Sequence, residues 1–219
     1  MEQALLTCPG DTAKMWRLQK SNMLAAMGAL GCEFTDLYAT CIYAYCSPVE
    51  RYVHIRGDGA VAWKYPDGSV EMMLFDWGKP GQNNPPFYPA YAMFDPALAA
   101  FNEHYSEDSS EALYGIRHKM AGSDTVLLGI DYHSLEEGIE GIRLPIPNEA
   151  VAVAVFTDGV TRVPGLFWGN VIQELTAFKS MRGEFMKRRM LRFMEDYATS
   201  SSRPGDDLAC AAINLQELS

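Results

Sequence analysis

The chain has 219 residues, of which 48% are hydrophobic and 21% are charged. This length suits one domain, and the apolar share can bury a substantial core, which excludes disorder as the main state. The 28 acidic and 18 basic residues give a formal net charge of −10, so the surface repels a phosphate backbone and excludes non-specific nucleic-acid binding.

Cysteine usage and the longest apolar run bear on the expected location. The chain has five cysteines, an odd number, without Cys-x-x-Cys spacing, so we expect free thiols in a reducing compartment. The longest apolar run, residues 150–156, is too short to span a bilayer, and the first residues do not resemble a signal peptide. The sequence therefore predicts a cytoplasmic protein with no membrane partner.

The predicted elements begin with a helix and continue with strands. Residues 12–30 carry apolar side chains at helical spacing, and Gly28 and Gly31 mark the end of this helix. Turn dipeptides at Asp58-Gly59 and Asp67-Gly68 separate short apolar runs, which predicts an antiparallel meander. The meander is expected over residues 37–75, with strands at residues 38–46, 52–55, 60–65 and 70–75.

Loops and short strands are expected in the middle of the chain, where prolines and asparagines interrupt the apolar pattern. The predicted strands are residues 88–94, 114–119, 125–132 and 150–157, a weak helix is predicted at residues 97–104, and loops at residues 76–89 and 136–141.

Two helices and a strand are predicted in the last third of the chain. Residues 170–178 have apolar side chains at helical spacing, and a longer amphipathic helix follows at residues 186–197. Residues 208–215 form the last predicted strand, and no linker divides the chain, so we expect one mixed α/β domain of the α+β kind. The apolar face of the longer helix is predicted to comprise Met186, Met190, Phe193, Met194 and Tyr197.

Three aspartates lie where predicted strands begin or end. Thr157-Asp158-Gly159 follows a buried strand, Gly205-Asp206-Asp207 precedes the last strand, and Gly57-Asp58-Gly59 lies between two strands. Each signal alone is unspecific, because Asp-Gly is a common turn dipeptide and an acidic pair is common in exposed loops. A carboxylate at the end of an apolar strand, with a glycine beside it, nevertheless lies where the backbone can approach an ion closely.

In this order, the three elements resemble motifs of the type 2C family of metal-dependent Ser/Thr protein phosphatases, its compact bacterial members above all. The resemblance runs from about residue 36 to the end of the chain. It implies two antiparallel β-sheets packed as a sandwich and flanked by helices, with two Mg²⁺ or Mn²⁺ ions at one end. It further implies that Asp158 and Asp206 are metal ligands, and that Asp58 holds its turn or helps to bind an extra metal.

The activity that the resemblance implies is the hydrolysis of phosphoserine or phosphothreonine in proteins. In that family, a water activated by two metals attacks phosphorus in line, so no protein nucleophile is needed. The implied partners are a phosphorylated protein substrate or a kinase-related protein.

The chain also departs from the family pattern. The family's early Asp and its Asp-Gly-x-Gly-Gly element have no counterpart in these residues, and Arg162 stands where some relatives have an acid. We therefore expect residues 1–219 to form a single phosphatase-like domain that lacks the N-terminal motif-bearing segment and its strands and is inactive by itself. Three hypotheses stay open. The first is a fragment of a longer phosphatase, and the second is a non-catalytic pseudophosphatase that binds its partner without turnover. The third is a structural fragment whose sheet edge another segment covers.

Overall fold

The structure is a computed structural model of the whole chain. It describes residues 11–77, 86, 88–94, 96, 98–99, 101, 113–120, 123–131, 141–198 and 205–217.

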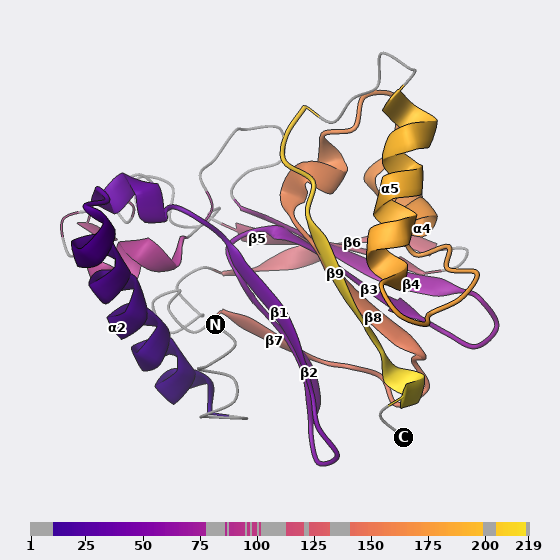
Figure 1. Cartoon of the computed structure of the whole chain (residues 1–219), viewed down its shortest axis with the longest axis horizontal. Helices are drawn as coiled ribbons and strands as arrows, with labels where there is room; N and C mark the ends of the chain where they lie inside the picture. Colours follow the sequence, from indigo (N-terminus) through magenta and orange to yellow (C-terminus); the bar gives the residue numbers. More distant parts are fainter. Residues whose placement is uncertain are drawn as a thin grey trace.

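The described strands form two antiparallel sheets, which confirms the predicted α+β fold class (Figure 1). The small sheet has the order β1-β2-β7, and the large sheet has the order β6-β5-β4-β3-β8-β9. The small sheet comprises β1 (Cys41–Cys46), β2 (Arg51–Arg56) and β7 (Ile142–Pro145). The large sheet comprises β3 (Gly59–Lys64), β4 (Val70–Trp77), β5 (Leu113–Met120), β6 (Ser123–Asp131), β8 (Ala152–Phe156) and β9 (Cys210–Asn214).

The chain crosses from the small sheet to the large sheet between β2 and β3, so the prediction of one continuous meander is wrong at this point. Two glycines make the crossing possible, because Gly57 and Gly59 have φ angles of +94° and +134°. A Cβ at Gly59 would lie 2.6 Å from the carbonyl oxygen of Phe156. The close approach therefore places the start of β3 against the end of β8.

One apolar core contains buried residues of both sheets. Val53 of β2, Val61 of β3 and Val153 of β8 are buried in it. The opposite face of β3 is also buried, because Ala60 and Ala62 belong to a second cluster beneath the helices. Burial of both faces explains why this strand is apolar along its length.

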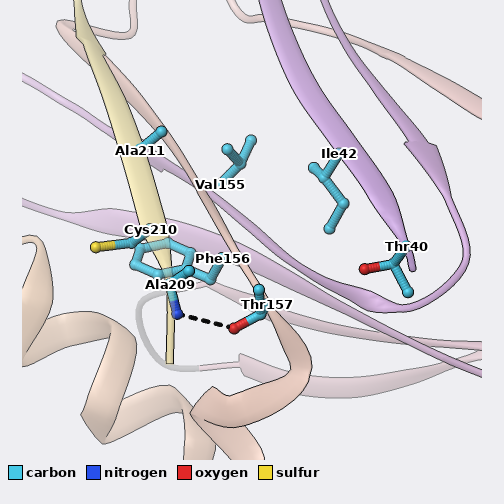
Figure 2. A pocket seen from close by; sticks show the side chains of 8 residues that line it. All are labelled: Thr40, Ile42, Val155, Phe156, Thr157, Ala209, Cys210 and Ala211. Carbon is cyan, nitrogen blue, oxygen red and sulfur yellow. Dashed lines mark hydrogen bonds between the residues drawn. The ribbon is translucent and has the colours of Figure 1, made fainter. Parts of the chain in front are cut away.

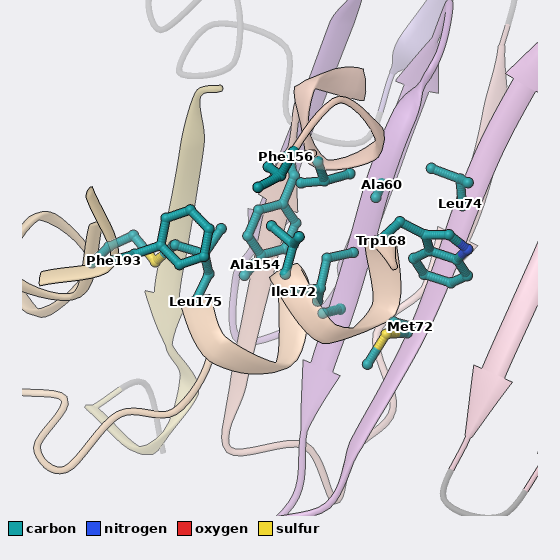
Figure 3. Packing of buried hydrophobic residues seen from close by; sticks show 14 of the residues in the cluster. Ala60, Met72, Leu74, Ala154, Phe156, Trp168, Ile172, Leu175 and Phe193 are labelled. Atoms are coloured by element: carbon teal, nitrogen blue, oxygen red, sulfur yellow. The ribbon is translucent and has the colours of Figure 1, made fainter. Parts of the chain in front are cut away.

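Two helices cover the outer face of the large sheet (Figure 3). These are α4 (Trp168–Leu175) and α5 (Phe185–Ala198), which pack on the strands through side chains such as Ile172 and Phe193. The predicted apolar face of α5 is confirmed except for Met194, whose side chain is 39% exposed.

A third helix, α2 (Thr12–Leu30), lies beside the small sheet (Figure 1). Its predicted bounds are confirmed. The side chain of Asp11 caps its first turn by accepting a hydrogen bond from the Lys14 N–H, and Gly31 ends it in the left-handed conformation. Met15 packs on the tyrosines of the small sheet. None of the helices in the described ranges is both long enough and apolar enough to cross a membrane.

A short 3₁₀ helix replaces one predicted strand, and another predicted strand begins later than expected. Residues 88–94 are not a strand, because η2 (Pro89–Met93) begins at a proline that lacks the N–H group a sheet ladder needs. The strand predicted at residues 38–46 begins only at Cys41, after η1 (Phe34–Leu37). The predicted helix at 97–104 and the loops at 76–89 and 136–141 lie largely outside the described residues.

Candidate metal site at one end of the large sheet

Strand register places four aspartates at the same end of the large sheet. In the antiparallel ladders, Ala60 of β3 and Cys210 of β9 both lie opposite Phe156 at the end of β8. Gly59 of β3 lies opposite Phe75 of β4. The residues just beyond these pairs include Asp58, Asp76, Asp158 and Asp206, which we call the acidic end.

Asp158 and Asp206 are held together by the threonine between β8 and Asp158. The hydroxyl of Thr157 donates a 2.8 Å hydrogen bond to the carbonyl oxygen of Asp207. The same hydroxyl accepts a 3.0 Å bond from the N–H of Ala209, which Figure 2 shows as a dashed line. The Thr157 N–H also donates to the Ala209 carbonyl oxygen. These bonds fix the two predicted ligand motifs side by side.

Glycine at position 159 completes this contact. A Cβ at Gly159 would lie 2.4 Å from the carbonyl oxygen of Asp207, so no other residue fits without a shift of the backbone. A further bond runs from the N–H of Gly205 to the carbonyl oxygen of Arg162 at 2.8 Å. The Asp-Gly element and the Asp-Asp element, which are separate in the sequence, therefore form one local structure.

The glycines on either side of Asp58, Gly57 and Gly59, allow it to lie next to this structure. The approach of Gly59 to the carbonyl oxygen of Phe156 brings Asp58 next to the end of β8, which Asp158 follows. Asp58 and Asp158 are half-buried, whereas Asp76 and Asp206 are exposed. The acidic end therefore opens to solvent on the side of Asp206.

Burial and neighbouring negative charge destabilise the charged forms of Asp58 and Asp158. Burial, followed by the negative charge of Asp158, raises the pKa of Asp58 to about 7. Burial and then the charge of Asp206 also raise the pKa of Asp158, although Arg162 acts in the opposite direction. Burial and the same aspartates raise the pKa of Tyr88, which indicates that this phenol lies near them. Protons or a cation would relieve the repulsion.

Asp76 is the member of the acidic end that sequence analysis missed. Its signal lies in the hairpin that joins β3 and β4. The turn at Asp67-Gly68 sets a register in which Gly59 pairs with Phe75, so the next positions outward are Asp58 and Asp76. Counting outward from the turn dipeptide would have found Asp76 as the neighbour of Asp58.

An apolar hollow of about 260 Å³ adjoins the acidic end (Figure 2). On one side it is lined by Ile42 of β1, the edge strand of the small sheet, and by Thr40 just before that strand. On the other side it is lined by the β8–β9 pair of the large sheet. Thr157 lines the hollow and directly precedes Asp158, so the apolar hollow and the acidic end are adjacent at this residue.

The donor chemistry of the acidic end fits Mg²⁺ or Mn²⁺, since both ions prefer carboxylate oxygens. The set is sparse, however. Within the described ranges, no three Asp, Glu, His or Cys side chains gather closely enough to form a metal-binding group. Asp58, Asp158 and Asp206 would therefore hold an ion in smaller combinations, with water completing its coordination.

Comparisons with models of protein families, with curated proteins and with solved structures find no match to this chain.

Proposed function

We propose that the acidic end belongs to the divalent-metal site of a phosphoprotein phosphatase similar to the type 2C family. The observation that carries the proposal is the convergence of Asp58, Asp158 and Asp206 from three separate segments on one end of the large sheet. The motif resemblance selects Asp158 and Asp206 as metal ligands, and Asp58 as a residue that holds its turn or helps to bind an extra metal.

The chemistry that a bound Mg²⁺ or Mn²⁺ supplies is activation of water and stabilisation of negative charge on a phosphoryl group. Asp158 and Asp206 would hold the ion, since their backbones are tied through Thr157. Asp58 would add a carboxylate from the opposite strand. Burial is the main cause of the raised pKa of Asp58, and the charge of Asp158 is the second. The second cause supports this role, because neighbouring negative charge favours a bound cation.

A second candidate function is a pseudophosphatase-type module that binds a phosphorylated or kinase-related protein without turnover. The sparse ligand set favours it, because no group of three ligands forms in the described part of the chain. Mg²⁺ retains most of its waters and binds weakly to one or two carboxylates.

Direct measurement of Mn²⁺ binding tests the metal site without relying on activity. We expect electron paramagnetic resonance to show Mn²⁺ bound to the chain, and Asp158→Asn or Asp206→Asn to weaken that binding sharply. The matched control is Asp67→Asn, at the hairpin turn between β3 and β4, at the other end of the sheet from Asp58. Equal affinity in all these proteins would overturn the proposal.

Phosphopeptide turnover separates the two functions. Because the carboxylates are few, we expect residues 1–219 to be inactive by themselves at ordinary metal concentrations. Under the phosphatase hypothesis, a large excess of Mn²⁺ would restore phosphate release, and Asp158→Asn would abolish that release. A binding module would bind the phosphopeptide and release no phosphate even at saturating Mn²⁺. A chain that neither binds nor cleaves the phosphopeptide would contradict both functions.

A further inference from the structure

A second hollow, of about 510 Å³, lies between the end of α4 and the face of α5. Four basic side chains line it, and we call it the basic hollow: Lys179, Arg188, Arg189 and Arg192. Two acidic residues, Glu174 and Asp196, also line it, so its formal charge is +2 (four minus two). Its helices cover the outer face of the large sheet, and none of its lining residues belongs to the acidic end.

The charge of this region is opposite to that of the whole chain. The chain carries a net charge of −10. The segment from position 174 to position 196 contains six of its 18 basic residues and four acidic residues, which gives +2. A basic patch on an acidic protein attracts acidic ligands that the rest of its surface repels.

Two of the four cations already have partners within the protein. Arg189 forms an ion pair with Glu174, and its side chain is only 15% exposed. Arg188 donates a 2.7 Å hydrogen bond to the carbonyl oxygen of Arg182. Arg189 therefore fastens α5 to α4, and Arg188 ties α5 to the segment that precedes it.

Lys179 and Arg192 differ from these two. Neither makes a hydrogen bond or ion pair with any residue that the structure describes, and Arg192 is exposed on α5. Asp196 lies one turn further along α5 and also lines the hollow, but it forms no ion pair with Arg192. Two cations thus remain available to an anionic ligand.

Aromatic rings line the same hollow. Phe178 and Phe185 contact each other edge to face, with ring centroids 4.9 Å apart. Phe185 is buried, whereas Phe178 is half-buried and presents apolar surface to the hollow. The ammonium group of Lys64 lies 5.8 Å from the Phe178 ring centre and donates to the carbonyl oxygen of Thr176. Contacts with Phe185 and with the Lys64 ammonium group therefore position the Phe178 ring.

We propose that the basic hollow docks a short Asp- or Glu-rich segment of a partner protein. Carboxylates of that segment would pair with Lys179 and Arg192, while one aromatic or large aliphatic side chain would lie on Phe178. Free cations beside an apolar surface match this chemistry, because charge selects the partner and the apolar contact anchors it. The proposal is independent of the acidic end and holds whether or not metal binds there.

Fluorescence anisotropy with a labelled peptide tests this docking. The probe has one Phe flanked by glutamates, and two comparison peptides replace either the glutamates with glutamine or the Phe with alanine. We expect the Glu–Phe peptide to bind, and both comparison peptides to bind about 5-fold or more weakly. Because only the peptide changes, these comparisons leave the fold of the protein untouched. Equal affinity for all three peptides would overturn the proposal.

Charge-matched variants of the full chain test the two cations. We expect Lys179→Gln and Arg192→Gln each to weaken the Glu–Phe peptide about 3- to 10-fold at low salt. Lys187→Gln removes the same charge from the helix that carries Arg192, but Lys187 pairs with Glu184 and does not line the hollow, so we expect less than about a 2-fold change.

Three results would overturn the docking proposal. Equal weakening by all three substitutions would show non-specific attraction. Tighter binding of an RNA oligonucleotide than of the peptide would identify a different ligand class. Self-association in sedimentation that Arg192→Gln abolishes would identify a second copy of the chain as the occupant.

Discussion

The hydroxyl of Thr157 donates a 2.8 Å hydrogen bond to the carbonyl oxygen of Asp207, a residue 50 positions away. This bond and the return bond from the Ala209 N–H fasten the end of β8 to the start of β9. The two carboxylates that we assign to the metal site, Asp158 and Asp206, are the immediate neighbours of the bonded residues. The threonine therefore positions the site without contributing a carboxylate.

The first prediction is that Thr157→Val weakens both stability and Mn²⁺ binding. Valine has the size of threonine but cannot bond to the Asp207 carbonyl or the Ala209 N–H, and because both bonds are exposed to water the expected loss is about 0.5–1.5 kcal/mol. Denaturant unfolding measures the first effect, and Mn²⁺ titration measures the second. Thr157→Ser retains the hydroxyl and is expected to preserve metal affinity. If valine and serine behave alike, the hydroxyl does not position the site.

The second prediction concerns two glycine-to-alanine substitutions with opposite effects. Gly159→Ala places a Cβ 2.4 Å from the Asp207 carbonyl oxygen, and we expect a loss of about 2 kcal/mol or more. Gly28→Ala lies in α2 with nothing within 4 Å of the new Cβ, and we expect a gain of about 0.5–1 kcal/mol from helix propensity. Unfolding curves that move in the same direction would contradict the packing of Gly159.

The parts of the site that sequence analysis predicted are those with local signals. Asp58 and Asp158 belong to Asp-Gly dipeptides, and Asp206 opens an acidic pair, so each is visible within three residues. Asp76 has no such signal, because its membership depends on the β3–β4 register. Its position follows from counting residues along two paired strands. The secondary-structure propensities of single residues do not report which strands pair.

The errors in the predicted fold also have physical causes. The dipeptide Asp58-Gly59 suggested a hairpin, but flanking glycines with positive φ let the chain cross between sheets instead. The run of basic residues in α5 is by itself typical of a solvated helix face. The structure instead buries most of Arg189 against Glu174, because α4 packs beside α5. Contacts between elements decide such cases, and single-sequence patterns do not report them.

The third prediction tests how α5 packs on the sheet. Phe193 is 1% exposed and belongs to the cluster that joins α5 to the large sheet, so Phe193→Ala should cost about 3–5 kcal/mol. Leu191, on the same helix, is 56% exposed, and Leu191→Ala should change the free energy of unfolding by about 0.5 kcal/mol or less. Similar losses in the two variants would mean that α5 presents a different face.

The last prediction uses the raised pKa of Asp58. Its carboxyl has a pKa of about 7 in the folded protein, against an ordinary value of 3.8, so the folded state binds this proton more tightly than the unfolded state does. The resulting stabilisation is complete below about pH 4 and is lost as the pH rises to about 7. Asp58→Asn removes this dependence. In chelator at about pH 8, we expect the variant to be more stable than the parent by about 1–3 kcal/mol, and at about pH 4 to match it.

A control for this pH effect is the exposed turn residue Asp67. Hydrogen bonds from the Ser69 hydroxyl and N–H lower the pKa of Asp67, which is the opposite shift. Its carboxylate therefore stabilises the folded state above the ordinary pKa, and that contribution is lost on acidification. Asp67→Asn should consequently give no gain at about pH 8. Denaturant unfolding of the three proteins at both pH values measures the difference. If Asp58→Asn and the parent unfold with the same free energy at about pH 8, neither burial nor the other aspartates of the acidic end destabilise the Asp58 carboxylate.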